Sequence, residues 1–130
     1  MSKSTLLKAF NSLLTDFMED VELIFPNDKN IKTAKTTVDT MKKANPSIII
    51  RMWFKHITSR YGQKIIEGDI NYFLDKDYSE DVQDMSNGSD LTKLIDALRD
   101  PIKNMGEANQ ETTLEYLQKL CKLSDAYTSA

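Results

Sequence analysis

Hydrophobic side chains in the first 45 residues recur at helical intervals of three and four. The first set runs from Leu6 to Ile24 and predicts an amphipathic helix that ends near Phe25, before Pro26. Asp28 then stands where a second helix needs an N-cap. The apolar stripe of this second helix is narrow and consists of Ile31, Ala34, Val38 and Met41. Its other faces carry five lysines, namely Lys29, Lys32, Lys35, Lys42 and Lys43.

A third helix is predicted over about 46–60, with Asn45 as N-cap and Pro46 at the first helical position. It carries two apolar stripes. The first consists of Ile49, Met52, Trp53 and His56, and the second of Ile50, Phe54, Ile57 and Tyr61. A helix that is apolar on two sides must be packed from both. We therefore expect this helix to lie at the centre of the domain.

Turn residues divide the second half of the chain. A break is expected at Gly62, after which 63–67 continues the helix as far as a left-handed C-cap at Gly68. Asp69 is expected to cap a short helix, and the acidic stretch 75–90 is the predicted loop. Helical spacing resumes in four residues, Leu91, Leu94, Ile95 and Leu98. We expect Asp100-Pro101 to interrupt or kink that helix, and Asn109 to cap a last one that runs through Cys121 to Tyr127.

Alternating polar and apolar runs typical of strands do not occur, which predicts an all-α fold. The chain of 130 residues is long enough for one domain with a substantial core, so residues 1–130 are predicted to form a single bundle of about five or six helices. The single cysteine fits a reducing compartment. No secretory signal or membrane span is evident in the sequence. We expect an intracellular protein.

Catalytic and metal-binding patterns are weak. His56 and Cys121 are the sole residues of their types, and each lies on an apolar helical stripe, which favours packing over a thiol–imidazole site. One His and one Cys also fall short of a structural zinc set. Asp75, Asp77 and Asp81 have EF-hand spacing, but Glu80 replaces the required glycine and Ser86 the bidentate glutamate. We therefore expect no enzyme activity, no cofactor and no metal.

Charge is unevenly distributed. Residues 29–64 contain nine Lys/Arg and one acid, a net of +8, whereas residues 67–100 contain three Lys/Arg and ten acids, a net of −7. Three interpretations remain open. The two halves neutralise each other through surface pairs, each worth under about 1 kcal/mol. They dock on another protein or another copy of the chain. Alternatively, the lysine-rich second helix binds phosphate, with the salt dependence that counterion release imposes.

Known nucleic-acid motifs fit poorly. The short connection at Asn45-Pro46 between two basic helices resembles a helix-turn-helix, but the second helix would bury its reading face. No strands are predicted that could carry the aromatic platform of an RNA-binding sheet. The pI near 5.2 weakens this class further.

Five stretches of the sequence resemble one group of known proteins. They are FPNDKNI (25–31), ANPSIIIRMW (44–53), YGQKIIEGDINYFLDKDYS (61–79), LRDPIKNM (98–105) and YLQKLCKLSDAY (116–127). The chain is similar over almost its whole length to small helical proteins of uncharacterised function from large nucleocytoplasmic DNA viruses of algae and other protists. This resemblance implies an all-α fold and a viral origin, and it supplies no binding residues.

The sequence thus predicts a non-enzymatic protein–protein interaction protein, a minor structural, capsid or virion-associated component located in the host cytoplasm or the particle. The alternative is a nucleic-acid-associated or regulatory protein that uses the basic segment 29–64. The predicted contact residues are Lys32, Lys35, Lys42, Lys43, Asp77, Glu80, Asp81 and Asp84.

Overall fold

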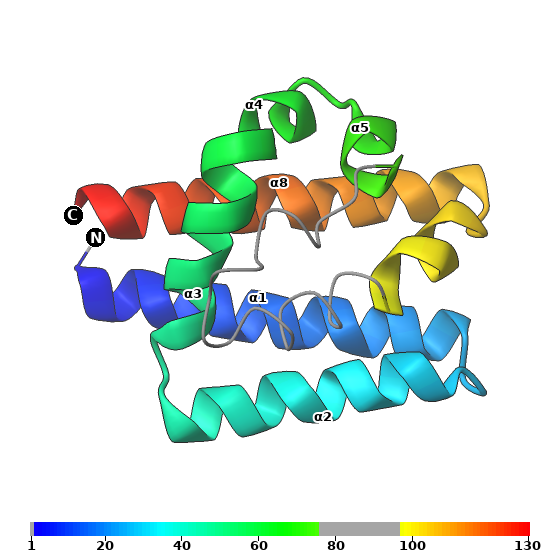
Figure 1. Cartoon of the computed structure of the whole chain (residues 1–130), viewed down its shortest axis with the longest axis horizontal. Helices are drawn as coiled ribbons and strands as arrows, with labels where there is room; N and C mark the ends of the chain where they lie inside the picture. Colours follow the sequence, from blue (N-terminus) through cyan, green and yellow to red (C-terminus); the bar gives the residue numbers. More distant parts are fainter. Residues whose placement is uncertain (1, 76–96) are drawn as a thin grey trace.

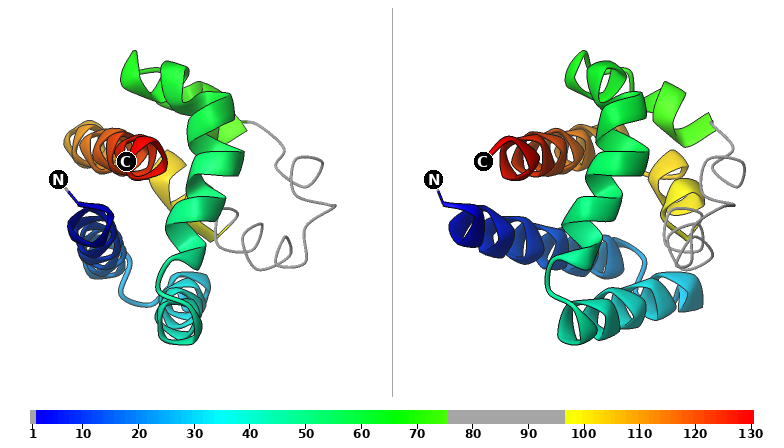
Figure 2. Two further views of the ribbon diagram at one scale, coloured as in Figure 1. Left: turned by 90° about the vertical axis from the view of Figure 1, so that its left-hand side faces the viewer. Right: turned by 60° about the vertical axis from the view of Figure 1, so that its left-hand side comes forward.

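The structure describes residues 2–75 and 97–130, except for the side chains of Phe73 and Asp75. Three long helices lie side by side in this part of the chain. In this computed structural model they are α1 (Lys3–Ile24), α2 (Lys29–Ala44) and α8 (Glu107–Ser129). α1 lies between the other two and contacts both, and the two chain termini lie near each other (Figure 1). A fourth helical column crosses this layer on one side (Figure 2).

The crossing column is the predicted central helix. It consists of α3 (Ile48–Trp53), a π-helical turn η1 (Phe54–Thr58) and α4 (Ser59–Ile66), which follow one another without a gap. Five of its buried residues are four positions apart: Ile49, Trp53, Ile57, Tyr61 and Ile65. In a regular α-helix each four-residue step turns the side chain by about 40°. The wider π turn, in which Ser59 N–H bonds to Phe54 O, offsets part of that rotation and keeps the five residues directed at the core.

Two predicted features of the central helix are wrong. The helix begins at Ile48, because Asn45 Oδ1 accepts bonds from the N–H (3.2 Å) and hydroxyl (3.1 Å) of Ser47 and so forms a turn instead of an N-cap. No break occurs at Gly62, which is buried inside α4. The cost of a helical glycine, about 1 kcal/mol, is smaller than the gain from burying its neighbours Tyr61 and Ile65.

The predicted caps at Asp28, Gly68 and Asp69 agree with the structure. Asp28 accepts bonds from the N–H groups of Asn30 (2.9 Å) and Ile31 (3.2 Å) at the start of α2. Gly68 has a φ of 91°, as expected of a left-handed C-cap after α4. Asp69 then accepts a bond from Tyr72 N–H at 3.1 Å and caps α5 (Ile70–Asp75). All three predictions are confirmed.

The C-terminal part differs from expectation at two points. Residues 97–103 are helical, so the expected interruption at Pro101 does not occur, whereas a kink there stays a prediction. The last helix begins at Glu107, with Gly106 at the N-cap position, and the prediction of Asn109 as cap is wrong. Nearly all of the predicted loop 75–90, and the restart at Leu91, Leu94 and Ile95, lie outside the described residues.

The core lies between the three-helix layer and the crossing column. Trp53 is 2% exposed, and its ring meets Phe10 of α1 edge to face with centroids 5.9 Å apart. Leu117, Leu120 and Cys121 of α8 belong to the same buried cluster. Strands are absent from the described residues. The prediction of an all-α bundle around a central helix is confirmed.

Candidate protein-binding surface on α2

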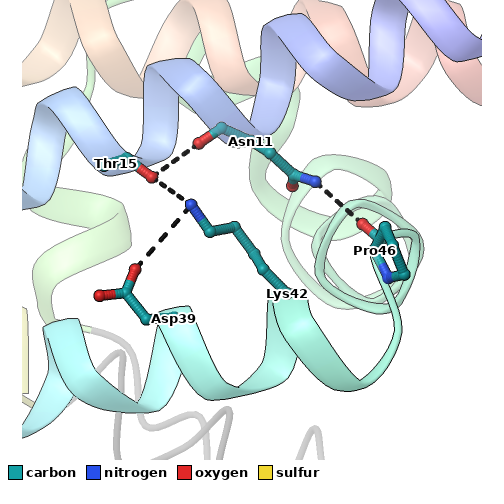
Figure 3. Close-up of polar contacts among 5 residues, drawn as sticks. All are labelled: Asn11, Thr15, Asp39, Lys42 and Pro46. Atoms are coloured by element: carbon teal, nitrogen blue, oxygen red, sulfur yellow. Dashed lines mark hydrogen bonds and ion pairs between the residues drawn. The ribbon is translucent and has the colours of Figure 1, made fainter.

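The second helix is attached to α1 by two of the four predicted lysines. Lys35 Nζ lies 3.4 Å from Glu22 Oε1. Lys42 Nζ donates to Thr15 Oγ1 at 2.5 Å and lies 3.9 Å from Asp39 Oδ1 (Figure 3). Both lysine side chains are half-buried at the α1–α2 seam. Their first role is therefore to hold the two helices together.

The polar contacts between α1 and α2 continue toward the start of the central column. Thr15 Oγ1 donates to Asn11 O at 3.0 Å, and Asn11 Nδ2 donates to Pro46 O at 2.9 Å (Figure 3). Lys42, Thr15 and Asn11 also line a depression of about 380 Å³, shared with Lys8 and Asp16. α2 and the turn that follows it are thereby fixed to one side of α1.

The other two predicted lysines, Lys32 and Lys43, are exposed on the outer face of α2. They share that side with four further exposed residues at helical spacing. We call this set the lysine stripe; it consists of Lys29, Lys32, Thr33, Thr36, Thr40 and Lys43. The buried residues Ile31, Ala34 and Val38 lie on the opposite face. A depression of about 440 Å³ runs along the stripe between Lys32 and Met41.

Two of the three threonine hydroxyls of the stripe are already engaged. Thr33 Oγ1 donates to Lys29 O at 3.0 Å, and Thr36 Oγ1 donates to Lys32 O at 3.1 Å. A hydroxyl has one hydrogen, so these two groups have no donor left for a ligand. The stripe therefore offers lysine ammonium groups separated by methyl-bearing side chains.

The predicted acidic contact residues Asp77, Glu80, Asp81 and Asp84 lie outside the described residues. So does most of the acidic segment 67–100, which one of the three interpretations pairs with the basic segment 29–64. Among the residues that are described, the acids paired with Lys35 and Lys42 come from α1 and from α2 itself. Lys32 and Lys43 stay predicted contact residues, whereas Lys35 and Lys42 have structural partners.

The residues considered for chemistry lie in the core. Cys121 and His56 are both buried, and burial raises the pKa of the Cys121 thiol, although contacts with Thr58 and Trp53 act in the opposite direction. A raised pKa keeps the thiol protonated at neutral pH, and the thiolate is the nucleophilic form. Across 2–75 and 97–130, no three His, Cys, Asp or Glu side chains gather in a way that could hold a metal ion.

A second surface was missed by the sequence reasoning. Leu23 and Ile24 at the end of α1 are 79% and 36% exposed, and they border a groove of about 230 Å³ between α1 and α8. Asp20 lines the same groove and accepts a hydrogen bond from the Tyr116 hydroxyl. This bond is the main reason that the pKa of Tyr116 is raised to about 12. The position of Leu23 outside the apolar stripe of α1 was the available signal.

No helix in the described part of the chain is both long enough and apolar enough to cross a membrane. Comparison of the chain with models of protein families, with curated proteins and with solved structures found no match.

Proposed function

We propose that this chain is a non-enzymatic protein–protein interaction protein that docks through the lysine stripe of α2. The observation that carries the proposal is the division of the α2 lysines. Lys35 and Lys42 are used to attach the helix to α1, whereas Lys29, Lys32 and Lys43 are exposed on its outer face. The partner surface that fits is acidic and helical or flat.

The shape of the stripe supports this proposal. It spans fourteen residue steps from Lys29 to Lys43, or about 21 Å of helix. Because α2 is capped by Asp28 and joined to α1, binding would order little backbone, and a preformed surface loses less entropy on association. Opposite charges across such an interface mainly set orientation and association rate.

The threonines favour protein over nucleic acid as the ligand. Phosphate oxygens are bound by hydrogen-bond donors, and the hydroxyl donors of Thr33 and Thr36 are directed to the backbone. Their methyl groups can pack against another protein surface. The observation that supports nucleic acid as a second candidate is the exposure of Lys29, Lys32 and Lys43, although Asp39, with its side chain 47% exposed, lies one turn before Lys43 and reduces the positive charge there.

The biological setting is part of the proposal. The resemblance to small helical proteins of large DNA viruses supports a minor structural or virion-associated role, in the infected cytoplasm or in the particle. Mass spectrometry of purified particles tests this point separately from docking, and absence of the chain from particles would leave only a role in the infected cell.

The docking surface is tested by charge reversal. The double variant Lys32→Glu/Lys43→Glu is compared with Lys55→Glu/Lys122→Glu, which changes two exposed lysines on other elements by the same charge. Immobilised chains are incubated with nuclease-treated lysate of infected cells over a salt series. We expect proteins that bind the wild type and the control double variant but are lost from the stripe variant. Equal retention by both variants would refute docking through the stripe.

The same variants test the second candidate with labelled duplex DNA and single-stranded RNA. If the three stripe lysines neutralised three phosphates of a duplex, the logarithm of the binding constant would fall against the logarithm of salt concentration with a slope of about −2.7. The stripe variant would reduce the steepness by about two thirds. Such a slope, together with no protein capture after nuclease treatment, would favour the nucleic-acid function.

A further inference from the structure

The groove between the C-terminal half of α1 and the N-terminal half of α8 has the features of a second binding site. Phe17, Val21, Leu23 and Ile24 line it from α1, and Thr112 and Tyr116 from α8. Single exposed apolar residues are common on proteins, but here Leu23 and Ile24 adjoin each other at the edge of a depression. At about 230 Å³ the groove is smaller than the usual site of a drug-sized ligand and suits one or two inserted side chains.

The surroundings of the groove are acidic. Asp20 lines it, with its carboxylate held by the Tyr116 hydroxyl. Asp16, one turn earlier on α1, lies close enough to contribute to the raised pKa of Tyr116. An apolar groove with a carboxylate fixed at its edge is complementary to an apolar side chain flanked by cations.

We propose that this groove binds a basic amphipathic helical segment of another protein, with a large apolar residue inserted beside Leu23 and lysine or arginine side chains directed at Asp16 and Asp20. Helix-in-groove recognition uses anchors at positions i, i+3 or i+4 and i+7. The cations of such a segment would fall at the intervening positions and reach the carboxylates at the edge. This site is separate from the lysine stripe and does not depend on it.

A second copy of the chain fits less well. In a two-fold pairing of this face, Asp16 and Asp20 of each copy would approach a surface that carries the same acids, and like charges brought together destabilise an interface. The lysine stripe of another copy has the right charge but carries threonines where the groove requires a large apolar anchor. A partner that combines both properties in one helix is therefore the occupant that the surface favours.

The test uses labelled 18-residue synthetic helical peptides and the full chain, followed by fluorescence anisotropy. One peptide carries leucine anchors and lysines, a second has the same anchors with glutamates, and a third has the lysines with alanine at the anchor positions. We expect binding of the first peptide alone, weakened by added salt. The proposal is overturned if the acidic peptide binds as well as the basic one, or if the alanine peptide binds as well as the leucine peptide.

Two variants locate the site. Leu23→Ser should weaken binding of the first peptide by about tenfold or more, since loss of an apolar anchor contact is typically of that size. Asp16→Lys should weaken it further, whereas the matched control Asp125→Lys, an exposed acid near the other end of α8, should not. Because Leu23 and Asp16 are exposed, both variants should keep the helical circular dichroism of the wild type. Unchanged affinity in both, or a dimer in sedimentation equilibrium that Leu23→Ser dissociates, would refute the proposal.

Discussion

Replacing Gly62 by alanine tests the finding that the central column is continuous. Gly62 is buried in the middle of α4, where glycine costs about 1 kcal/mol relative to alanine. A methyl group built at this position would lie 3.4 Å from Thr58 Cγ2 and 3.9 Å from Thr58 Cβ, which are ordinary contact distances. Burial of that methyl adds up to about 0.8 kcal/mol. We expect Gly62→Ala to stabilise the fold by about 1 kcal/mol.

The assay is chemical and thermal unfolding followed by circular dichroism. For a chain of this length, 1 kcal/mol corresponds to a rise in Tm of about 4 °C. Gly68→Ala is the matched control, because Gly68 has a φ of 91° that alanine adopts only with strain, and its Tm should fall. A fall in Tm for Gly62→Ala comparable to that of Gly68→Ala would mean that the helix breaks at Gly62 and would refute the continuous column.

Three further predictions concern single side chains. Asp28→Ala removes the N-cap of α2 and should lower the free energy of unfolding by about 1 kcal/mol in urea titrations. In spectrophotometric titration Tyr116 should ionise near pH 12. Because its pKa is raised in the folded state, the protonated Tyr116 hydroxyl should stabilise the fold fully below about pH 10, and this contribution should be lost as the pH rises to about 12. Tyr116→Phe should not show this loss of stability. Cys121 should react with a thiol reagent only after unfolding, since it is buried; rapid reaction in the native state would contradict this.

Sequence reasoning was accurate where structure depends on neighbouring residues. The Asp28 and Asp69 caps and the Gly68 turn require contacts within three positions of the chain, and residue type alone reveals them. It was inaccurate where tertiary burial competed with local preference. Gly62 remains helical because Tyr61 and Ile65 are buried on either side of it. Asn45 has the correct type for a cap but bonds to Ser47 in a turn instead.

The π turn could not be predicted from local propensity. The sequence feature that indicates it is an apolar residue at every fourth position through the column: Ile49, Trp53, Ile57, Tyr61 and Ile65. In a regular α-helix this spacing would rotate the last of these residues away from the first. The sequence placed Ile49 and Trp53 on one apolar stripe and Ile57 and Tyr61 on another, whereas in the structure all four belong to one row of buried residues. They were wrongly assigned to a regular helix.

The binding surfaces were only partly predictable for a different reason. All α2 lysines look alike in sequence, and their separation into seam and stripe depends on partners far away along the chain, such as Glu22 for Lys35 and Thr15 for Lys42. Leu23 and Ile24 are adjacent in the sequence, and only Ile24 was assigned to the apolar stripe of α1. In the structure both residues border the groove. Only the position of α8 beside α1 decides which apolar residues become core and which remain at the surface.

α1 connects the two proposed binding surfaces. One side of it carries Glu22 and Thr15, which contact the lysines at the seam of α2, and another carries Asp20 beside the α8 groove. Asp16 lies between them: it lines the depression beside Lys42 and also raises the pKa of Tyr116. The acids of α1 thus neutralise part of the positive charge of α2 and supply the negative charge of the groove. Because α1 is a single helix of 22 residues packed on both neighbours, the cationic stripe and the anionic groove are held at a fixed separation. If both proposed surfaces are occupied at once, two partners of opposite charge are held in one relative orientation.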